Sequence, residues 1–150
     1  MKIKILSKDF ILDEDMLKLG TYWYRTNILF NCEKVELSVG TEKNKEEELS
    51  EILTDIEKEI NYIQDNYVVI KSEIKESDLI ELKNDFWLDE NEEEITPEDF
   101  INRITLVGIH IDVVNKKIDN INLEYDDGEI FLGHRISVDI KDRKIISADI

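Results

Sequence analysis

Residues 104–140, ITLVGIHIDVVNKKIDNINLEYDDGEIFLGHRISVDI, decide the fold of this chain. Apolar residues recur at every second position over 107–113 and again over 121–125, as in strands that bury one face. Asp127-Gly128 predicts a hairpin turn, because glycine accepts the positive φ that such a turn requires. Residues 130–140 then predict a long strand, and a last strand is expected from Lys144 onward. The last 47 residues are therefore expected to form a four-stranded antiparallel meander.

Three segments of the chain together resemble a bacterial protein family known only as a domain of unknown function. They are DDGEIFLGHRI at 126–136, LIELKNDFWL at 79–88 and the final ADI at 148–150. The resemblance covers the last half of the chain well and the first half loosely. The family has no established activity, so the resemblance implies no substrate, cofactor or catalytic residue.

The middle of the chain predicts helices. Residues 45–66 carry apolar residues at three- and four-residue spacing, which form one stripe on a helix. Residues 67–82 begin like a strand, but the resemblance favours a second, interrupted helix. Thr96 and Pro97 are typical of a helix start, and this short helix is expected to run to about Arg103.

Alternating apolar residues up to Gly40 predict antiparallel strands at the N-terminus. Strands, then helices, then strands favour the α+β class. We therefore expect one α+β domain over residues 1–150, with N-terminal antiparallel strands, central amphipathic helices and the C-terminal meander.

The charge of the chain is concentrated in its middle third. The formal net charge is −17, and residues 41–103 hold 21 acidic against seven basic residues. Such a surface repels nucleic acid and anionic membranes and attracts a basic partner, although it also fits a solvated helical face. No apolar run is long enough to span a membrane, and the single cysteine, Cys32, allows no intrachain disulfide. A cytoplasmic protein is expected.

One cluster of residue types could bind a metal or perform acid–base chemistry: Asp126, Asp127, Glu129 and His134. The acids surround the predicted hairpin turn, where such residues are common for conformational reasons. His134 falls on the apolar face of the predicted strand and is expected to be buried, unless a bulge at Gly133 redirects it. No metal-binding motif is present, so we expect no metal and no cofactor.

A candidate partner-binding surface follows the second helical segment. Trp87 precedes a run of acidic residues, and an exposed tryptophan there would be a plausible anchor for a basic partner. The acidic residues are Asp89, Glu90, Glu92, Glu93 and Glu94. The favoured reading is nevertheless that Trp87, like Trp23, Phe86 and Phe131, belongs to the core, because aromatic side chains dominate buried area. Cys32 is expected to be a small buried hydrophobe.

Three functional hypotheses remain open. The first is a protein-binding module that docks a basic partner, by analogy of size and charge with immunity proteins that neutralise toxins. The second is a metal-dependent or acid–base enzyme that uses the Asp126–His134 region. The third is a self-associating structural subunit. The sequence favours the first hypothesis, because the charge asymmetry is its only feature that indicates a kind of partner.

Overall fold

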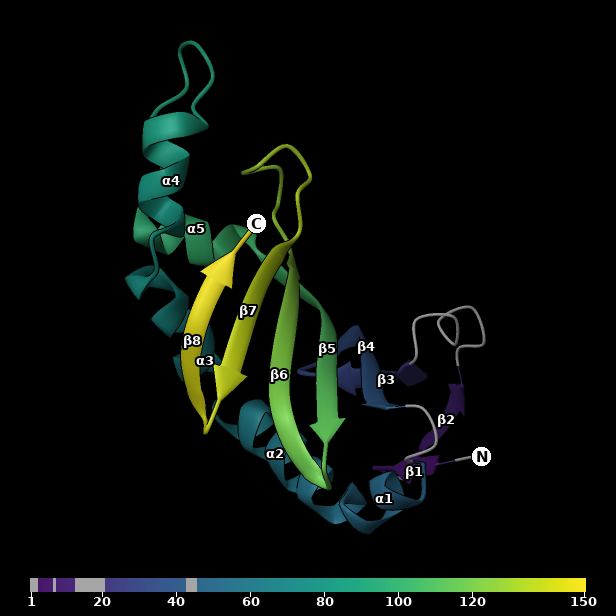
Figure 1. The fold of residues 1–150 in the computed structure, drawn as a ribbon. Coiled ribbons are helices and arrows are strands. Elements are labelled where there is room, and N and C mark those ends of the chain that lie inside the picture. Colours follow the sequence, from purple (N-terminus) through teal and green to yellow (C-terminus); the bar gives the residue numbers. More distant parts are fainter. Residues whose placement is uncertain (1–2, 7, 13–20, 43–45) are drawn as a thin grey trace.

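The computed structural model of the chain describes residues 3–6, 8–12, 21–42 and 46–150. Its strands form one eight-stranded sheet whose order follows the sequence, and the helices lie between the fourth and fifth strands (Figure 1). The strands are β1 (Ile3–Ile5), β2 (Lys8–Leu12), β3 (Thr21–Phe30), β4 (Glu33–Glu42), β5 (Thr105–Val114), β6 (Lys117–Asp126), β7 (Ile136–Lys141) and β8 (Lys144–Asp149). The helices are α1 (Glu46–Glu51), α2 (Leu53–Asp65), α3 (Tyr67–Glu73), the 3₁₀ helix η2 (Ile74–Glu76), α4 (Leu79–Phe86) and α5 (Pro97–Arg103).

A parallel pair of strands joins the two halves of the chain. β4 and β5 run parallel, with Ser38 opposite His110, whereas the other neighbouring strands described here are antiparallel. A parallel pair needs a long crossover connection, and the helical middle of the chain supplies it. The predicted α+β class and the antiparallel β5–β8 meander are confirmed. The sequence did not indicate that both sets of strands share one sheet.

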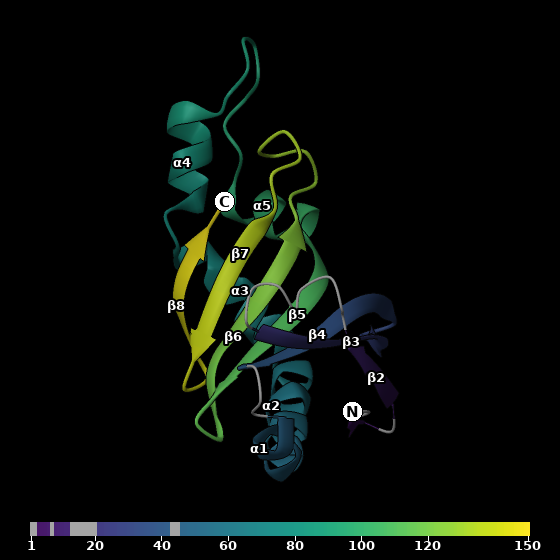
Figure 2. The same cartoon turned by 45° about the vertical axis from the view of Figure 1, so that its right-hand side comes forward.

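The core lies between the sheet and the helices. α2 and α3 pass behind the β5–β8 strands in Figure 1, and the turned view of Figure 2 shows them on the same side. The apolar stripe predicted over 45–66 is confirmed for five residues that are buried against the sheet, Leu49, Ile52, Ile56, Ile60 and Ile63, whereas Leu53 is only half-buried. The single helix expected there is divided into α1 and α2. Within the described residues, no helix is long and apolar enough to cross a membrane.

Tight turns connect the antiparallel strands. Asn31 and Cys32 between β3 and β4 both have positive φ (50° and 67°), and Asn115 and Lys116 between β5 and β6 do as well (51° and 60°). Two consecutive positive φ angles are typical of a type I′ hairpin turn, which matches the twist of the strands it joins. Cys32 is exposed at this turn, so its expected burial is wrong.

The helical reading of the segment after Tyr67 is confirmed, and so is the interruption. α3 passes into η2, and the Ser77 hydroxyl donates to the Ile74 carbonyl at 2.6 Å before α4 begins. Thr96 caps α5, because its side-chain oxygen accepts the Asp99 N–H at 3.2 Å. Phe86, the last residue of α4, is 79% exposed, so its expected place in the core is wrong.

The long strand predicted over 130–140 is wrong. β6 ends at Asp126, β7 begins only at Ile136, and the nine residues between them form a loop. Glu129 (φ 65°) and Leu132 (φ 56°) adopt the left-handed conformation, which a regular β-strand does not contain. His134 is exposed in this loop, so its expected burial on a strand face is wrong as well.

Candidate partner-binding site

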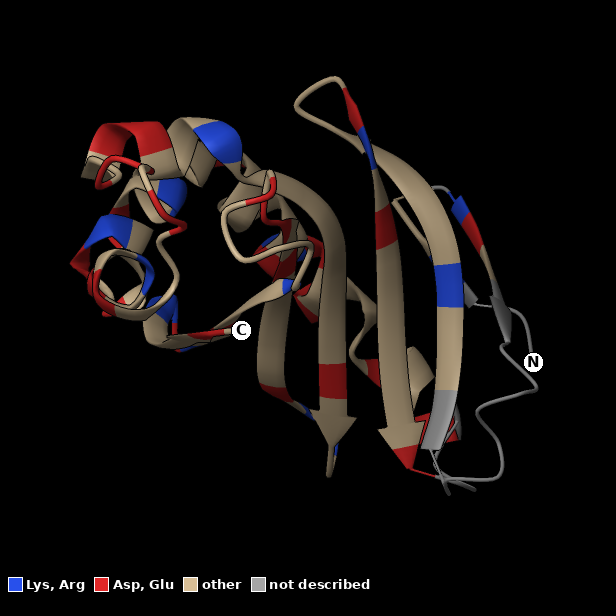
Figure 3. Ribbon diagram, turned by 90° about the horizontal axis from the view of Figure 1, so that it is seen from above, with Lys and Arg blue, Asp and Glu red and all other residues tan. Residues whose placement is uncertain are grey.

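The chain between α4 and α5 forms a loop that projects from one end of the molecule (Figures 1 and 2). We call residues 87–95 the acidic loop. Its predicted acidic residues are all exposed: Asp89, Glu90, Glu92, Glu93 and Glu94. Seen from above in Figure 3, acidic residues gather around the helical side of the molecule, while most of the sheet carries no charge.

Two side chains from α4 hold the acidic loop in place. Lys83 is only 4% exposed; its ammonium group donates to the Trp87 carbonyl at 2.7 Å and forms an ion pair with Glu92. Asn84 bonds Ile95 twice, donating to its carbonyl at 3.1 Å and accepting its N–H at 2.8 Å. Satisfied polar contacts of this kind favour one loop conformation over many. The exposed acids are therefore presented from a fixed backbone.

Trp87 connects the acidic loop to the β6–β7 loop (residues 127–135). Its ring meets Phe131 edge-on at 5.6 Å and His134 at 5.4 Å between centroids. Trp87 is half-buried, so it is neither a core residue nor a free anchor. Leu132 on the β6–β7 loop is 70% exposed, and Phe86 beside the acidic loop is exposed as well. We call the acidic loop, Phe86 and the β6–β7 loop together the end platform.

The candidate catalytic residues do not converge. The Asp127 carboxylate is buried and accepts the backbone N–H groups of Glu129, Phe131 and Gly133 at 3.1, 2.7 and 3.0 Å. Within the described part of the chain, no hydrogen bond or ion pair joins His134 to Asp127 or its acidic neighbours, and no group of three side chains could hold a metal ion. The Asp127 carboxylate thus organises the loop.

Asp126 serves the same loop from outside. One carboxylate oxygen accepts the Gly128 N–H at 2.9 Å, and the other accepts a bond from Arg135 at 3.1 Å. Glu129 is exposed. The loop is tied to α5 as well, because Arg103 donates to the Gly128 carbonyl at 2.7 Å.

A polar array on the open face of the sheet escaped the sequence analysis. His110 on β5 bonds the Ser38 hydroxyl of β4 through Nδ1 and the Glu124 carboxylate of β6 through Nε2, the latter at 3.0 Å. Gly108 leaves room for the imidazole, since a Cβ there would lie 2.9 Å from Nε2. Ser38 is fully buried, so its hydroxyl is closed to a substrate. The array joins three strands, and finding it required the β4–β5 register.

Two carboxyl groups on the same face have opposite pKa shifts. Burial, together with nearby Asp119, raises the pKa of Asp112. Burial also acts on Asp139, but bonds donated by Asn120, Asn122 and Ser147 outweigh it and lower the pKa of Asp139. A raised carboxyl pKa means that the folded state disfavours the charged form, and a lowered one means that it favours it.

The two shifts predict opposite effects of neutral substitution. Asp112→Asn is expected to raise the melting temperature at pH 7. This gain should shrink as the pH falls through the raised folded-state pKa of Asp112 and vanish below the unfolded carboxyl pKa of about 3.9, because wild-type Asp112 is then neutral in both states. Asp139→Asn is expected to lower the melting temperature at pH 7, with the loss fading as the pH falls below about 4. Thermal unfolding from pH 3 to 7 measures both.

Asp89→Asn is the control for these two variants, because it removes the same charge at an exposed site that does not contribute to either pKa shift. If Asp112→Asn and Asp139→Asn shift the melting temperature in the same direction at pH 7, the electrostatic account of this face is wrong.

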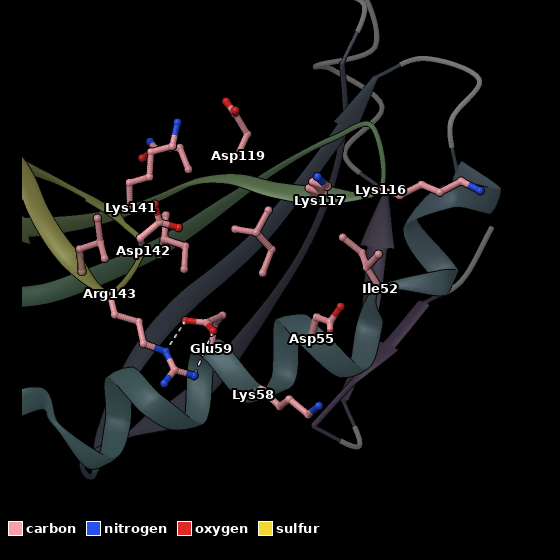
Figure 4. Close-up of a pocket in the computed structure, with 14 residues that line it drawn as sticks. Ile52, Asp55, Lys58, Glu59, Lys116, Lys117, Asp119, Lys141, Asp142 and Arg143 are labelled. Carbon is pink, nitrogen blue, oxygen red and sulfur yellow. Dashed lines mark hydrogen bonds and ion pairs between the residues drawn. The ribbon is translucent and has the colours of Figure 1, made fainter.

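A cleft of about 470 Å³ lies at the other end of the molecule, between α2 and the turns at 115–116 and 142–143 (Figure 4). Arg143 pairs with Glu59 at 3.2 Å, and Lys116 pairs with Glu51 at 3.1 Å. These pairs fasten the strand turns to the helices. In Figure 4, Lys58, Lys116 and Lys141 point in different directions, so the cations do not converge on one ligand.

A family model described as "Uncharacterized protein conserved in bacteria (DUF2262)" matches residues 9–150. The match thus includes most of the N-terminal half, where the sequence resemblance was only loose. No curated protein and no solved structure matches the chain.

Proposed function

We propose that this chain, which belongs to the uncharacterized bacterial family DUF2262, is a protein-binding module whose acidic end platform docks onto the basic surface of a partner protein. The observation that carries the proposal is the geometry of the acidic loop. It presents its acids from a backbone that Lys83 and Asn84 hold in place. A surface that is ordered before binding loses less conformational entropy when the partner arrives.

The charges of the platform are available to a partner. Within the described residues, Glu92 is the one acid of the loop that forms an ion pair, and Asp89, Glu90, Glu93 and Glu94 form none. Phe86 supplies an exposed apolar side chain next to them. An aromatic anchor surrounded by charged residues is the usual composition of a binding hot spot and its rim.

An enzyme that acts on nucleic acid is one class of protein with such a basic surface, because its substrate channel has to attract phosphates. An acidic platform placed over that channel would neutralise the enzyme, as an immunity protein does with its toxin. The proposal that the partner is such an enzyme is supported by the charge and size of the chain. The proposal that the partner surface is basic is supported by the exposed acids of the end platform.

Charge reversal in the acidic loop should weaken binding strongly. In Glu90→Lys/Glu93→Lys/Glu94→Lys, we expect the association rate constant for a basic partner to fall about 10- to 100-fold, because steering and rim contacts are both lost. The partner is first isolated by pull-down from bacterial lysate at low salt. Its binding to each purified variant is then measured by surface plasmon resonance at several salt concentrations.

The control carries the same change in net charge away from the platform, at exposed acids that form no ion pair with another described residue: Glu42→Lys/Asp65→Lys/Asp119→Lys. It should lose much less affinity than the loop variant. Equal losses in the two triple variants would show that only net charge matters and would contradict a defined platform. A second variant, Phe86→Ala, leaves the charge unchanged and should mainly raise the dissociation rate constant.

A further inference from the structure

One edge of the sheet ends at β8. This strand pairs with β7 on one side, and no strand of the described residues pairs with it on the other. An edge strand presents unpaired N–H and C=O groups at every second residue along its open side. Ile146, at a register shift in the middle of β8, is 59% exposed. The edge therefore offers both main-chain bonds and an apolar contact.

A groove of about 810 Å³ runs along this edge. Residues 144–148 of β8 form one wall, and the segment from the end of α3 to the start of α4 forms the other. The second wall carries three exposed acids, Glu73, Glu76 and Asp78. None of the three forms an ion pair within the described part of the chain.

The charge of the groove selects its occupant. A second copy of this chain would bring a net charge of −17 toward an acidic wall, and like charges brought together oppose association. An extended segment with lysine or arginine at alternate positions has the opposite property. Its main chain can pair with β8 while every second side chain faces the acidic wall.

We infer that β8 accepts an extended basic peptide segment as a ninth strand of the sheet. Alternate basic side chains of this segment enter the groove and pair with Glu73, Glu76 and Asp78. Its intervening apolar side chains cover Ile146. The inference rests on the proposed function, because the segment would belong to the same basic partner that the end platform docks.

The experiment uses the full chain and a defined probe, a fluorescent peptide of alternating lysine and valine. Fluorescence anisotropy should show binding, and amide hydrogen exchange should slow within residues 144–149. The same peptide methylated at alternate main-chain nitrogens keeps its charge but loses hydrogen-bond donors. We therefore expect its affinity to be at least about tenfold lower. Glu73→Lys/Glu76→Lys/Asp78→Lys should weaken binding of the unmethylated peptide by at least about tenfold.

The triple variant Glu42→Lys/Asp65→Lys/Asp119→Lys carries the same charge change away from both the groove and the end platform, and it should bind the peptide nearly as well as the wild type. Equal binding of the methylated peptide, or unchanged exchange over 144–149, would overturn strand addition. Sedimentation could instead show a dimer, with the β8 amides protected from exchange in the absence of peptide. That result would assign the edge to a second copy of the chain and would also overturn the addition of a peptide strand. Because the probe is a peptide, the result does not depend on whether the acidic loop binds a partner.

Discussion

Replacing Asp127 by alanine is expected to lower the free energy of unfolding by about 3–5 kcal/mol, which for a chain of this size lowers the melting temperature by roughly 10 °C. The carboxylate is buried and accepts three backbone N–H groups of the β6–β7 loop. A bond to a charged acceptor contributes about 1.5–3 kcal/mol, and such bonds are not additive. Alanine leaves the Phe131 N–H without its partner in a buried site, so the desolvation penalty adds to the loss.

Urea unfolding followed by circular dichroism measures this effect, and Asp126→Ala is the matched control. Asp126 is the adjacent acid, but it is exposed, and it bonds Gly128 and Arg135 at the surface. We expect it to cost about 1 kcal/mol or less. Asp127→Asn keeps one acceptor oxygen and should lie between the two. If Asp127→Ala costs no more than Asp126→Ala, the carboxylate does not hold the loop together.

The same loop explains where the sequence analysis succeeded and where it failed. The strands on either side were predicted because alternation follows from burial of one sheet face, and Leu123, Tyr125 and Val138 are indeed buried. The loop was missed because residues 130–140 retain a strand-like pattern. The strand is broken by hydrogen bonds that backbone N–H groups up to six positions later donate to Asp127, together with the positive φ at Glu129. Neither leaves a periodic signal.

A similar limit applies within β5. Alternation predicted that Val107 belongs to the buried face, but a register shift between Leu106 and Gly108 buries Leu106 and leaves Val107 half-buried. A bulge inserts one residue, so the side chains on one side of it point to the opposite face from the one that strict alternation predicts. A two-residue period therefore cannot locate a bulge.

The candidate site could be predicted only in part. The acidic loop follows from composition, and the helix start at Thr96 marks its end. The contacts that fix it could not be predicted, because Asn84 reaches across eleven positions to Ile95 and Lys83 is buried despite its charge. A buried lysine is uncommon unless it is paired, and its partner Glu92 was one of several equivalent acids in the sequence. The contact of Trp87 with His134 required the tertiary structure.

Gly128→Ala is expected to destabilise the fold by about 3 kcal/mol. Gly128 has a φ of 57°, and a Cβ placed on it would lie 2.5 Å from the Arg103 carbonyl oxygen at the end of α5. Alanine in the left-handed conformation costs about 1–2 kcal/mol, and overpacking against a backbone atom adds about 1–3 kcal/mol. The displacement should also break the bond from Arg103 to the Gly128 carbonyl, so the β6–β7 loop and α5 should separate.

Gly133→Ala separates these two contributions in the same loop. Gly133 also has a positive φ, 88°, but nothing lies within 4 Å of a Cβ at this position. It should therefore cost only the backbone strain, about 1 kcal/mol. The difference between the two variants in urea unfolding measures the contact between the β6–β7 loop and α5. If the two variants lose the same free energy of unfolding, α5 moves away from the added methyl group at little cost. The contact between α5 and the β6–β7 loop would then be weaker than its hydrogen bond indicates.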